Sequence, residues 1–247
     1  RICDPACGSG AYLVGMLHEL NELTHLLDTR AEQETAQDEY HRKLKIIQNN
    51  LYGVDIDPFA VNIARLRLWL TLAVEYAGNT PEPLPNLAFK IEVGNSLASP
   101  DPSGGLQPDI FRETRIKRYV SLKEQHLMAH GPEKISLFNN IKELRSEIAA
   151  WSQADDRRIL GFAWDVDFAE IFFGSADRQQ ECGFDIVIAN PPYGIKCEDA
   201  IRYQYFPRVR GEELQSKDSY GIFMARALQL LKPGGFFSFI VSDTWRT

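Results

Sequence analysis

Apolar residues along the chain follow two kinds of spacing, and together they predict strands that alternate with helices. The run from Phe184 to Ala189 is almost unbroken, rich in β-branched residues and too short for a helix, which indicates a strand covered on both faces of a parallel sheet. Leu51 to Asp55 has the same character. Weaker strand patterns occur at Arg1 to Cys3, Leu87 to Val93 and Phe236 to Val241.

Spacings of three and four between apolar residues predict amphipathic helices between these strands. The clearest pattern consists of Leu13, Met16, Leu17, Leu20, Leu23 and Leu27. Apolar residues resume after a polar stretch, at Ile47, so we expect one long helical crossover. Asp57 and Pro58 then supply an N-cap and a first helical residue for a helix that ends near Ala77. A last helix begins at Asp218 or Ser219 and stops at a Pro-Gly-Gly turn.

Five strands joined by helices predict an α/β fold with a doubly wound, mostly parallel sheet. We divide the chain into a first half at residues 1–98, a helical insertion at 99–160 and a second half at 161–247. The insertion opens with a loop rich in proline, glycine and serine and carries two polar helices, separated at His130 to Pro132. Its charged run from Arg112 to Lys123 is expected to be a solvated helix face rather than a nucleic-acid site.

Two further segments stand out after the insertion. The aromatic cluster at Phe162 to Phe168 and Ile171 to Phe173 is interpreted as core packing, with ligand stacking as the alternative. Cys197 to Lys217 is basic and irregular, with arginines among tyrosines. Such a loop is expected to move in the absence of its partner.

Composition limits this picture further. The chain has 247 residues, 44% of them hydrophobic, which suffices for one sizeable α/β core. Its net charge of -7 argues against a surface that grips nucleic acid throughout. The four cysteines, Cys3, Cys7, Cys182 and Cys197, form no paired C-x-x-C motifs, so incidental thiols are expected rather than disulfides or a metal site.

Three observations concern the context of the chain. No apolar run approaches the ~20 residues that cross a bilayer, and no secretory leader opens the sequence. We therefore expect a cytoplasmic protein without a membrane partner. The chain begins without methionine inside a predicted strand and stops just after another, so we expect a piece of a longer protein, truncated at both ends.

Polar residues that could bind a ligand or take part in a reaction lie where predicted strands end. Gly8 and Gly10 form a tight loop before a helix, which either lets a ligand approach the backbone or is a simple turn. Asp55, at the end of the second strand, can accept hydrogen bonds from both hydroxyls of a ribose. The glycine spacing of a dinucleotide site and the Lys-Ser/Thr of a phosphate loop are absent, so a nucleoside without a pyrophosphate fits best.

The strand at Phe184 to Ala189 ends in a turn stiffened by Pro191 and Pro192. The amide oxygen of Asn190 and the carbonyl of Pro191 can each accept one hydrogen from an amine on an aromatic ring. That grip localises the nitrogen lone pair and makes the amine a nucleophile, while Tyr193 offers a face on which the ring can stack. A methyl sulfonium donor in the neighbouring pocket is the natural electrophile.

Three segments in this order, Asp4 to Gly10, Gly53 to Pro58 and Asn190 to Tyr193, resemble the amino-adenine DNA methyltransferases of restriction-modification systems. Phe162 to Phe173 and Lys232 to Gly235 resemble the type II/IIG branch, in which restriction and modification enzymes are fused. The resemblance implies a Rossmann-like class I methyltransferase. Its implied reaction is methyl transfer from S-adenosylmethionine to the N6 amino group of adenine in DNA.

The resemblance also implies roles for single residues. The loop after the first strand would hold the methionine part of the cofactor, Asp55 its ribose and Ile56 one face of its adenine. The implied cofactor set is Asp4, Pro5, Ala6, Gly8, Gly10, Asp55, Ile56, Asn95 and Ser96. Asn95 is a departure, because similar enzymes usually have aspartate here to accept the adenine amino group; an asparagine oxygen can still accept. Asn190, Pro191, Pro192 and Tyr193 would grip a target adenine flipped out of the duplex.

The implied partner is double-stranded DNA, read mainly by a target-recognition region outside this chain. A fused nuclease is left open. The basic loop from Lys196 to Lys217 is a candidate contact to the DNA backbone, with a solvated loop as its equal alternative. Two other functions remain: an amino-methyltransferase for protein glutamine or RNA, which the inserted helices disfavour, and a cofactor-binding module without catalysis.

Overall fold

The protein, seen here in a computed structural model, is built on a five-stranded sheet in the order β3-β2-β1-β4-β5, in which every neighbouring pair is parallel. The structure describes residues 1–28, 36–76, 86–102, 110–151, 162–172, 182–196, 198–206 and 218–241. The strands are β1 (Ile2–Asp4), β2 (Leu51–Asp55), β3 (Ile91–Val93), β4 (Phe184–Ala189) and β5 (Leu231–Phe239). The predicted doubly wound parallel sheet is confirmed.

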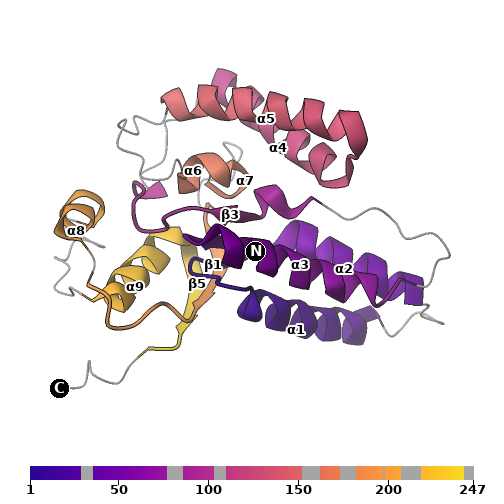
Figure 1. Cartoon of the computed structure of the whole chain (residues 1–247), viewed down its shortest axis with the longest axis horizontal. Coiled ribbons are helices and arrows are strands. Elements are labelled where there is room, and N and C mark those ends of the chain that lie inside the picture. Colours follow the sequence, from indigo (N-terminus) through magenta and orange to yellow (C-terminus); the bar gives the residue numbers. More distant parts are fainter. Residues whose placement is uncertain are drawn as a thin grey trace.

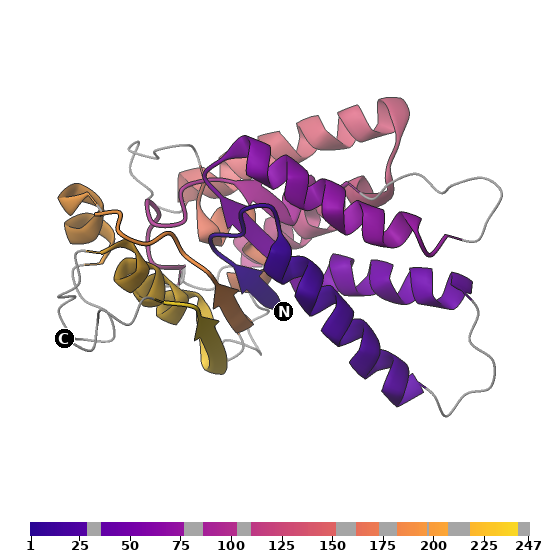
Figure 2. The same cartoon turned by 60° about the horizontal axis from the view of Figure 1, so that its bottom comes forward.

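One face of the sheet is covered by α1 (Ala11–Asp28), α2 (Ala36–Asn50) and α3 (Pro58–Ala73), which lie together in Figures 1 and 2. Alternate strand residues such as Ile2, Leu51 and Ile91 pack there against the apolar faces of the helices. The predicted long helical crossover contains two described helices, α1 and α2, and the residues between them lie outside the described part. The N-cap prediction for α3 is confirmed, since Oδ1 of Asp57 accepts the N–H of Phe59 at 2.9 Å.

The opposite face is covered by α9 (Ser219–Leu230) and by two short helices, α6 (Trp164–Asp167) and α7 (Ala169–Phe172). Trp164 and Phe168 are fully buried and meet Phe184 of β4 edge-on, with ring centroids 6.4 and 6.3 Å from the centroid of Phe184. The predicted core packing of this aromatic cluster is confirmed for its described members. Phe173 lies outside the described residues.

The predicted insertion contains a helical hairpin of α4 (Ile110–Met128) and α5 (Gly131–Trp151). The break that we predicted at His130 to Pro132 lies at Ala129 and His130, just before Pro132. Figure 1 shows it as an outer layer above α6 and α7 rather than on the sheet itself. Within its charged run, Lys117 pairs with Glu113 and Arg115 with Glu147, which agrees with a solvated, self-neutralised face. Lys123 is the exception, because it is buried.

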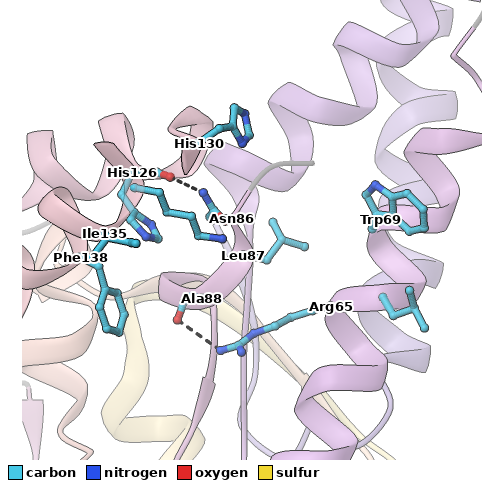
Figure 3. A pocket seen from close by; sticks show the side chains of 11 residues that line it. Arg65, Trp69, Asn86, Leu87, Ala88, His126, His130, Ile135 and Phe138 are labelled. Carbon is cyan, nitrogen blue, oxygen red and sulfur yellow. Dashed lines mark hydrogen bonds between the residues drawn. The ribbon is translucent and has the colours of Figure 1, made fainter. Parts of the chain in front are cut away.

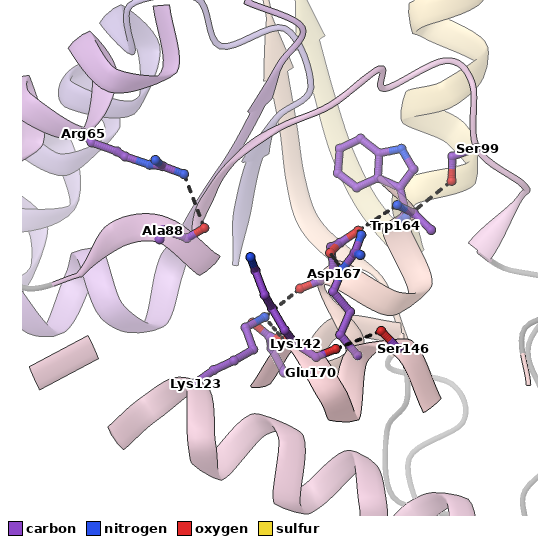
Figure 4. Close-up of polar contacts among 11 residues, drawn as sticks. Arg65, Ala88, Ser99, Lys123, Lys142, Ser146, Trp164, Asp167 and Glu170 are labelled. Atoms are coloured by element: carbon purple, nitrogen blue, oxygen red, sulfur yellow. Dashed lines mark hydrogen bonds and ion pairs between the residues drawn. The ribbon is translucent and has the colours of Figure 1, made fainter. Parts of the chain in front are cut away.

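Buried ion pairs tie this hairpin to the layer beneath it (Figure 4). Lys123 of α4 donates to Glu170 of α7 at 2.8 Å and to the carbonyl of Asp167 at 2.6 Å. Arg145 of α5 pairs with the carboxylate of Asp167 at 2.5 Å. Burial alone would raise the pKa of Glu170, but Lys123 and Lys90 outweigh it and hold that pKa below its ordinary value. Each inserted helix is thus anchored by its own charge pair.

Three predicted boundaries need correction. Leu87 to Phe89 form a 3-10 turn, η1, instead of the first half of a strand, because Phe89 packs against His126 and Phe138 of the hairpin. The last strand starts at Leu231, directly after α9, and the turn we predicted there is a bulge that shifts the register opposite Phe184 and Ile186. The basic segment after the proline turn includes a helix, α8 (Asp199–Tyr205).

Two further results concern the described residues alone. No helix in them is long and apolar enough to cross a membrane. Cys3 and Cys7 are buried free thiols, and burial raises the pKa of each above its ordinary value. Cys197 lies outside the described part.

Candidate active site

Strand order places the sequence motifs side by side at the carboxyl ends of neighbouring strands. β1 lies between β2, which follows it in the chain, and β4, which is reached only after a long crossover. The order therefore reverses between β1 and β4, and ligands of such sheets bind at the carboxyl ends of strands beside that point. The loop after β1 and the turn after β4 flank the reversal, and the loop after β2 lies next to them.

The loop after β1 is a compact turn held by hydrogen bonds to the Asp4 side chain and to the neighbouring strand. Oδ1 of the buried Asp4 accepts the N–H of Ala6 at 3.0 Å, and the N–H of Cys7 donates to the carbonyl of Val54 at 3.0 Å. Gly10 has a φ of +79°, and a Cβ on it would come within 2.9 Å of Cβ of Ala64. This position therefore requires glycine, whatever the loop binds.

Asp55 joins two of these loops. Its Oδ2 accepts the N–H of Gly8 at 2.7 Å, and its Oδ1 accepts the N–H of Asp57 at 2.9 Å. Each carboxylate oxygen can accept a second hydrogen bond. The half-exposed side chain can therefore fix the glycine loop and still receive two hydroxyl groups of a ligand.

Asp4 is chemically unlike Asp55, because its side chain is only 1% exposed. Burial raises the pKa of Asp4 to about 7, although the hydrogen bond from the N–H of Ala6 opposes the shift, and the nearby charge of Asp55 adds a smaller increase. Near neutral pH this carboxyl is therefore divided between its two protonation states.

The turn after β3 is fixed on both sides. Ser96 is buried, donates to the carbonyl of Pro5 at 2.5 Å, and its own carbonyl accepts the indole N–H of Trp164 at 3.0 Å. Oδ1 of Asn95 accepts the N–H groups of Leu97 and Ala98 at 3.0 and 3.2 Å. The oxygen that we expected to accept a hydrogen bond from the cofactor therefore already accepts hydrogen bonds within its own turn.

The turn after β4 presents its polar groups outward. Asn190 and Pro192 are exposed, Pro191 is buried, and Tyr193 is 42% exposed. The hydroxyl of Tyr193 lies within hydrogen-bond distance of Oδ1 of Asn190 and 2.7 Å from the carbonyl oxygen of Ile240. One hydroxyl proton can serve only one of these acceptors at a time, so the oxygen of Asn190 can be released to another donor.

Sequence reasoning missed the residues that support these loops. Arg226 of α9 is fully buried and donates to the carbonyls of Leu97 at 3.1 Å, Pro100 at 3.0 Å and Ser99. Burial lowers its pKa to about 9, against the opposing charge of Asp101. Ser219 donates to the carbonyl of Pro192 at 2.6 Å. The sequence signal that could have identified Arg226 is an arginine among the apolar residues of a predicted helix.

A separate hollow of about 690 Å³ lies between α3 and the inserted hairpin and contains none of the motif residues (Figure 3). Trp69 and Leu66 line one side, and His126, Ile135 and Phe138 line the other. Both ring nitrogens of the buried His126 have no hydrogen-bond partner in the described part of the chain. Burial lowers the pKa of His126, and the charge of Lys134 adds to this effect.

The loops after β1 and β2 offer groups that could hold a nucleoside. A Cβ at Gly8, whose φ is +50°, would meet no atom within 4 Å, so the loop backbone is open to a ligand. Asp55 supplies acceptors, and the exposed side chain of Ile56, at 57%, offers an apolar surface to a flat ring. Among the described residues, no group of three or more histidines, cysteines and acidic residues is arranged to hold a metal ion.

Residues 49–247 match the model of the Eco57I restriction-modification methylases. The chain belongs to this family. It is thus a methylase domain, and its family implies a methyl donor as cosubstrate.

Curated relatives agree with this assignment. A putative type II restriction enzyme and methyltransferase of Methanocaldococcus jannaschii is 26% identical over the whole of this chain, which covers 26% of that protein. The adenine-specific methyltransferase PglX of Streptomyces coelicolor is 30% identical over 46% of this chain, which covers 9% of its length. The chain therefore spans about a quarter or less of each relative.

Two solved structures align with nearly the whole of this chain at low similarity. A nuclease-deletion mutant of the Type ISP enzyme LlaGI with a DNA substrate mimic aligns over 97% of this chain and 15% of its own, with 17% identity and a TM-score of 0.47. The DrdV–DNA complex aligns over 99% of this chain and 17% of its own, with 15% identity and a TM-score of 0.46.

Proposed function

We propose that this methylase domain transfers a methyl group from S-adenosylmethionine to the N6 amino group of adenine in double-stranded DNA, as the modification part of a restriction-modification or phage-defence system. One observation carries the proposal. The glycine loop with Asp55 and the turn from Asn190 to Tyr193 flank the same reversal of strand order, so donor and acceptor pockets would adjoin. Family membership supports the reaction class.

In this proposal the loops after β1, β2 and β3 hold the methyl donor. The open backbone at Gly8 receives its amino-acid part, Asp55 its ribose hydroxyls and Ile56 one face of its base. The bound sulfonium supplies an electrophilic methyl group. Residues 1–98 would thus form the cofactor half, 161–247 the half that binds the target, and 99–160 the insertion between them.

The target half would receive a flipped adenine. Oδ1 of Asn190 and the carbonyl of Pro191 accept its two N6 hydrogens, and the exposed face of Tyr193 stacks on its ring. For this, the Tyr193 hydroxyl must lose its hydrogen bond to Oδ1 of Asn190 and donate to the carbonyl of Ile240 instead. The proton leaves after transfer, because Asn190 is not a base. Base recognition would come from a region outside this chain.

The test uses the full-length protein, labelled S-adenosylmethionine and duplex DNA. Asn190→Ala is expected to abolish most methyl incorporation into adenine, without loss of stability, because the side chain is exposed. Asn140→Ala, at an exposed asparagine of α5, is the matched control and should keep full activity. Undiminished adenine methylation by Asn190→Ala would remove the proposed role. Methylation of RNA or protein glutamine without DNA methylation would refute the substrate.

A further inference from the structure

The amide of Asn95 has a fixed orientation. Its Oδ1 accepts the N–H groups of Leu97 and Ala98 at 3.0 and 3.2 Å. A rotated amide would aim its own N–H2 group at these two donors and lose both bonds. The oxygen must therefore face the turn, and the Nδ2 group must face the other way.

The turn that carries Asn95 cannot adjust easily to a ligand. Ser96 is bonded to Pro5 on one side and to Trp164 on the other. Arg226 holds the carbonyl of Leu97, and a Cβ at Gly94 would come within 2.4 Å of the side chain of Phe162. The orientation of Asn95 is therefore set before any ligand binds.

Asn95 also lies where a purine would be read. Val93 is in register with Asp55, and the N–H of Gly94 donates to the carbonyl of Asp55 at 2.9 Å, so the two loop ends are adjacent. Asn95 is half-exposed, and its Nδ2 makes no hydrogen bond within the part of the chain that the structure describes. A nucleoside whose ribose sits on Asp55 would place its base toward this group.

We propose that Asn95 presents an N–H donor, and not an acceptor, to the purine of the bound nucleoside, and so determines how this domain reads the base. The proposal rests on the proposed function, because it assumes a nucleoside cofactor on Asp55. An amide donor pairs with an acceptor on the purine edge, which is a ring nitrogen in adenine or the 6-oxygen in hypoxanthine. It makes no bond with the 6-amino group, which is itself a donor.

Aspartate at this position would reverse the preference. Its carboxylate can accept the same two backbone N–H groups, so the turn is preserved, and its second oxygen replaces the donor by a charged acceptor. That oxygen favours the 6-amino group and repels a 6-oxo group. A hydrogen bond to a charged group changes an affinity by about tenfold or more.

The experiment measures calorimetric affinities of the full-length protein for S-adenosylhomocysteine and for its 6-oxo analogue, S-inosylhomocysteine. The wild-type protein is expected to bind the two within about fivefold, and Asn95→Asp to favour the 6-amino ligand by a ratio at least about tenfold larger. Asn140→Asp makes the same chemical change at an exposed position of α5 and should leave the ratio unaltered.

Two outcomes overturn the proposal, and they differ in what they imply. A ratio that is equal in wild type and Asn95→Asp, with S-adenosylhomocysteine still bound, refutes the role of Asn95 and leaves the proposed function intact. Failure of the wild-type protein to bind S-adenosylhomocysteine refutes the cofactor itself, and the role of Asn95 with it.

Discussion

The two sides of the candidate site are built differently. The loops after β1, β2 and β3 are bonded to one another and to buried residues behind them, as Ser96 is to Pro5 and Trp164. The turn after β4 instead exposes Asn190 and Tyr193, and its internal contact uses a hydroxyl that has a second acceptor in Ile240. We call the first three loops the donor side, because they would hold the methyl donor, and the turn after β4 the acceptor side, because it would receive the methylated base. The donor side is fixed before a ligand binds, whereas the acceptor side exposes the groups that would contact a substrate.

This difference predicts that substitutions on the two sides will have different consequences. Changes on the donor side should alter the free energy of unfolding as well as cofactor affinity, because binding groups there are also structural groups. Changes at Asn190 and Tyr193 should lower the rate of methyl transfer and leave unfolding almost unaffected. The following predictions test this contrast.

The largest effect is expected at Asp4. Its carboxyl ionises near pH 4 when unfolded but has a pKa of about 7 in the fold, where burial is the main cause. The stability it contributes is therefore complete below pH ~4 and is lost as the pH rises through ~7. Between these limits the unfolding free energy of the wild type should fall by up to about 4 kcal/mol relative to Asp4→Asn, which cannot ionise.

Urea denaturation of the full-length protein at a series of pH values measures this change. Asp57→Asn is the control, because an exposed N-cap asparagine keeps the cap and should retain the pH dependence of the wild type. Parallel curves for wild type and Asp4→Asn would show that Asp4 ionises normally in the fold.

Arg226→Leu should cost about 3 kcal/mol of unfolding free energy, because three backbone carbonyls lose a buried donor. Cofactor affinity should fall with it, as the turn from Asn95 to Pro100 loosens. Arg226→Lys, which keeps a donor, should recover part of both losses. If Arg226→Leu lost stability but kept its calorimetric affinity for the cofactor, the residues that stabilise the donor side would not be needed for binding, and the prediction would be wrong.

Tyr193→Ala tests the acceptor side. Stacking on an aromatic side chain contributes about 1–3 kcal/mol per base, so methyl transfer should slow by about 10- to 100-fold. Tyr193→Phe keeps the ring and loses only the hydroxyl, so its rate should stay within about threefold of the wild type. The thermal midpoints of both variants should match the wild type, and a fall of several degrees would contradict the contrast.

The smallest effect is expected at Arg67, whose hydrogen bond to the carbonyl of Ser9, at 3.1 Å, is exposed to solvent. Solvent competes for both groups, so Arg67→Ala should weaken cofactor binding by less than about threefold. A larger calorimetric change would show that exposed contacts also hold the donor loop, and that burial is not what distinguishes the two sides.

The sequence determined most of the strands, the longer helices and the strand ends that carry the candidate residues, because these depend on local patterns. The run from Phe184 to Ala189, the cap at Asp57 and the break before Pro132 each follow from neighbouring residues, and each is present in the fold. The same holds for the choice of Asp55 and Asn190 as candidates, because a polar residue after a buried strand is visible without a structure.

Only the tertiary structure decided how the loops are joined and oriented. Ser96 and Pro5 are 91 positions apart, and Arg226 is 127 positions from Ser99, so no local pattern relates them. The 3-10 turn at Leu87 to Phe89 arises in the same way, from contact with the distant hairpin. The direction of the Asn95 amide depends on the N–H groups of Leu97 and Ala98, which only the folded turn brings to it. Hydrogen bonds are directional, so the sequence alone does not show which way the amide points.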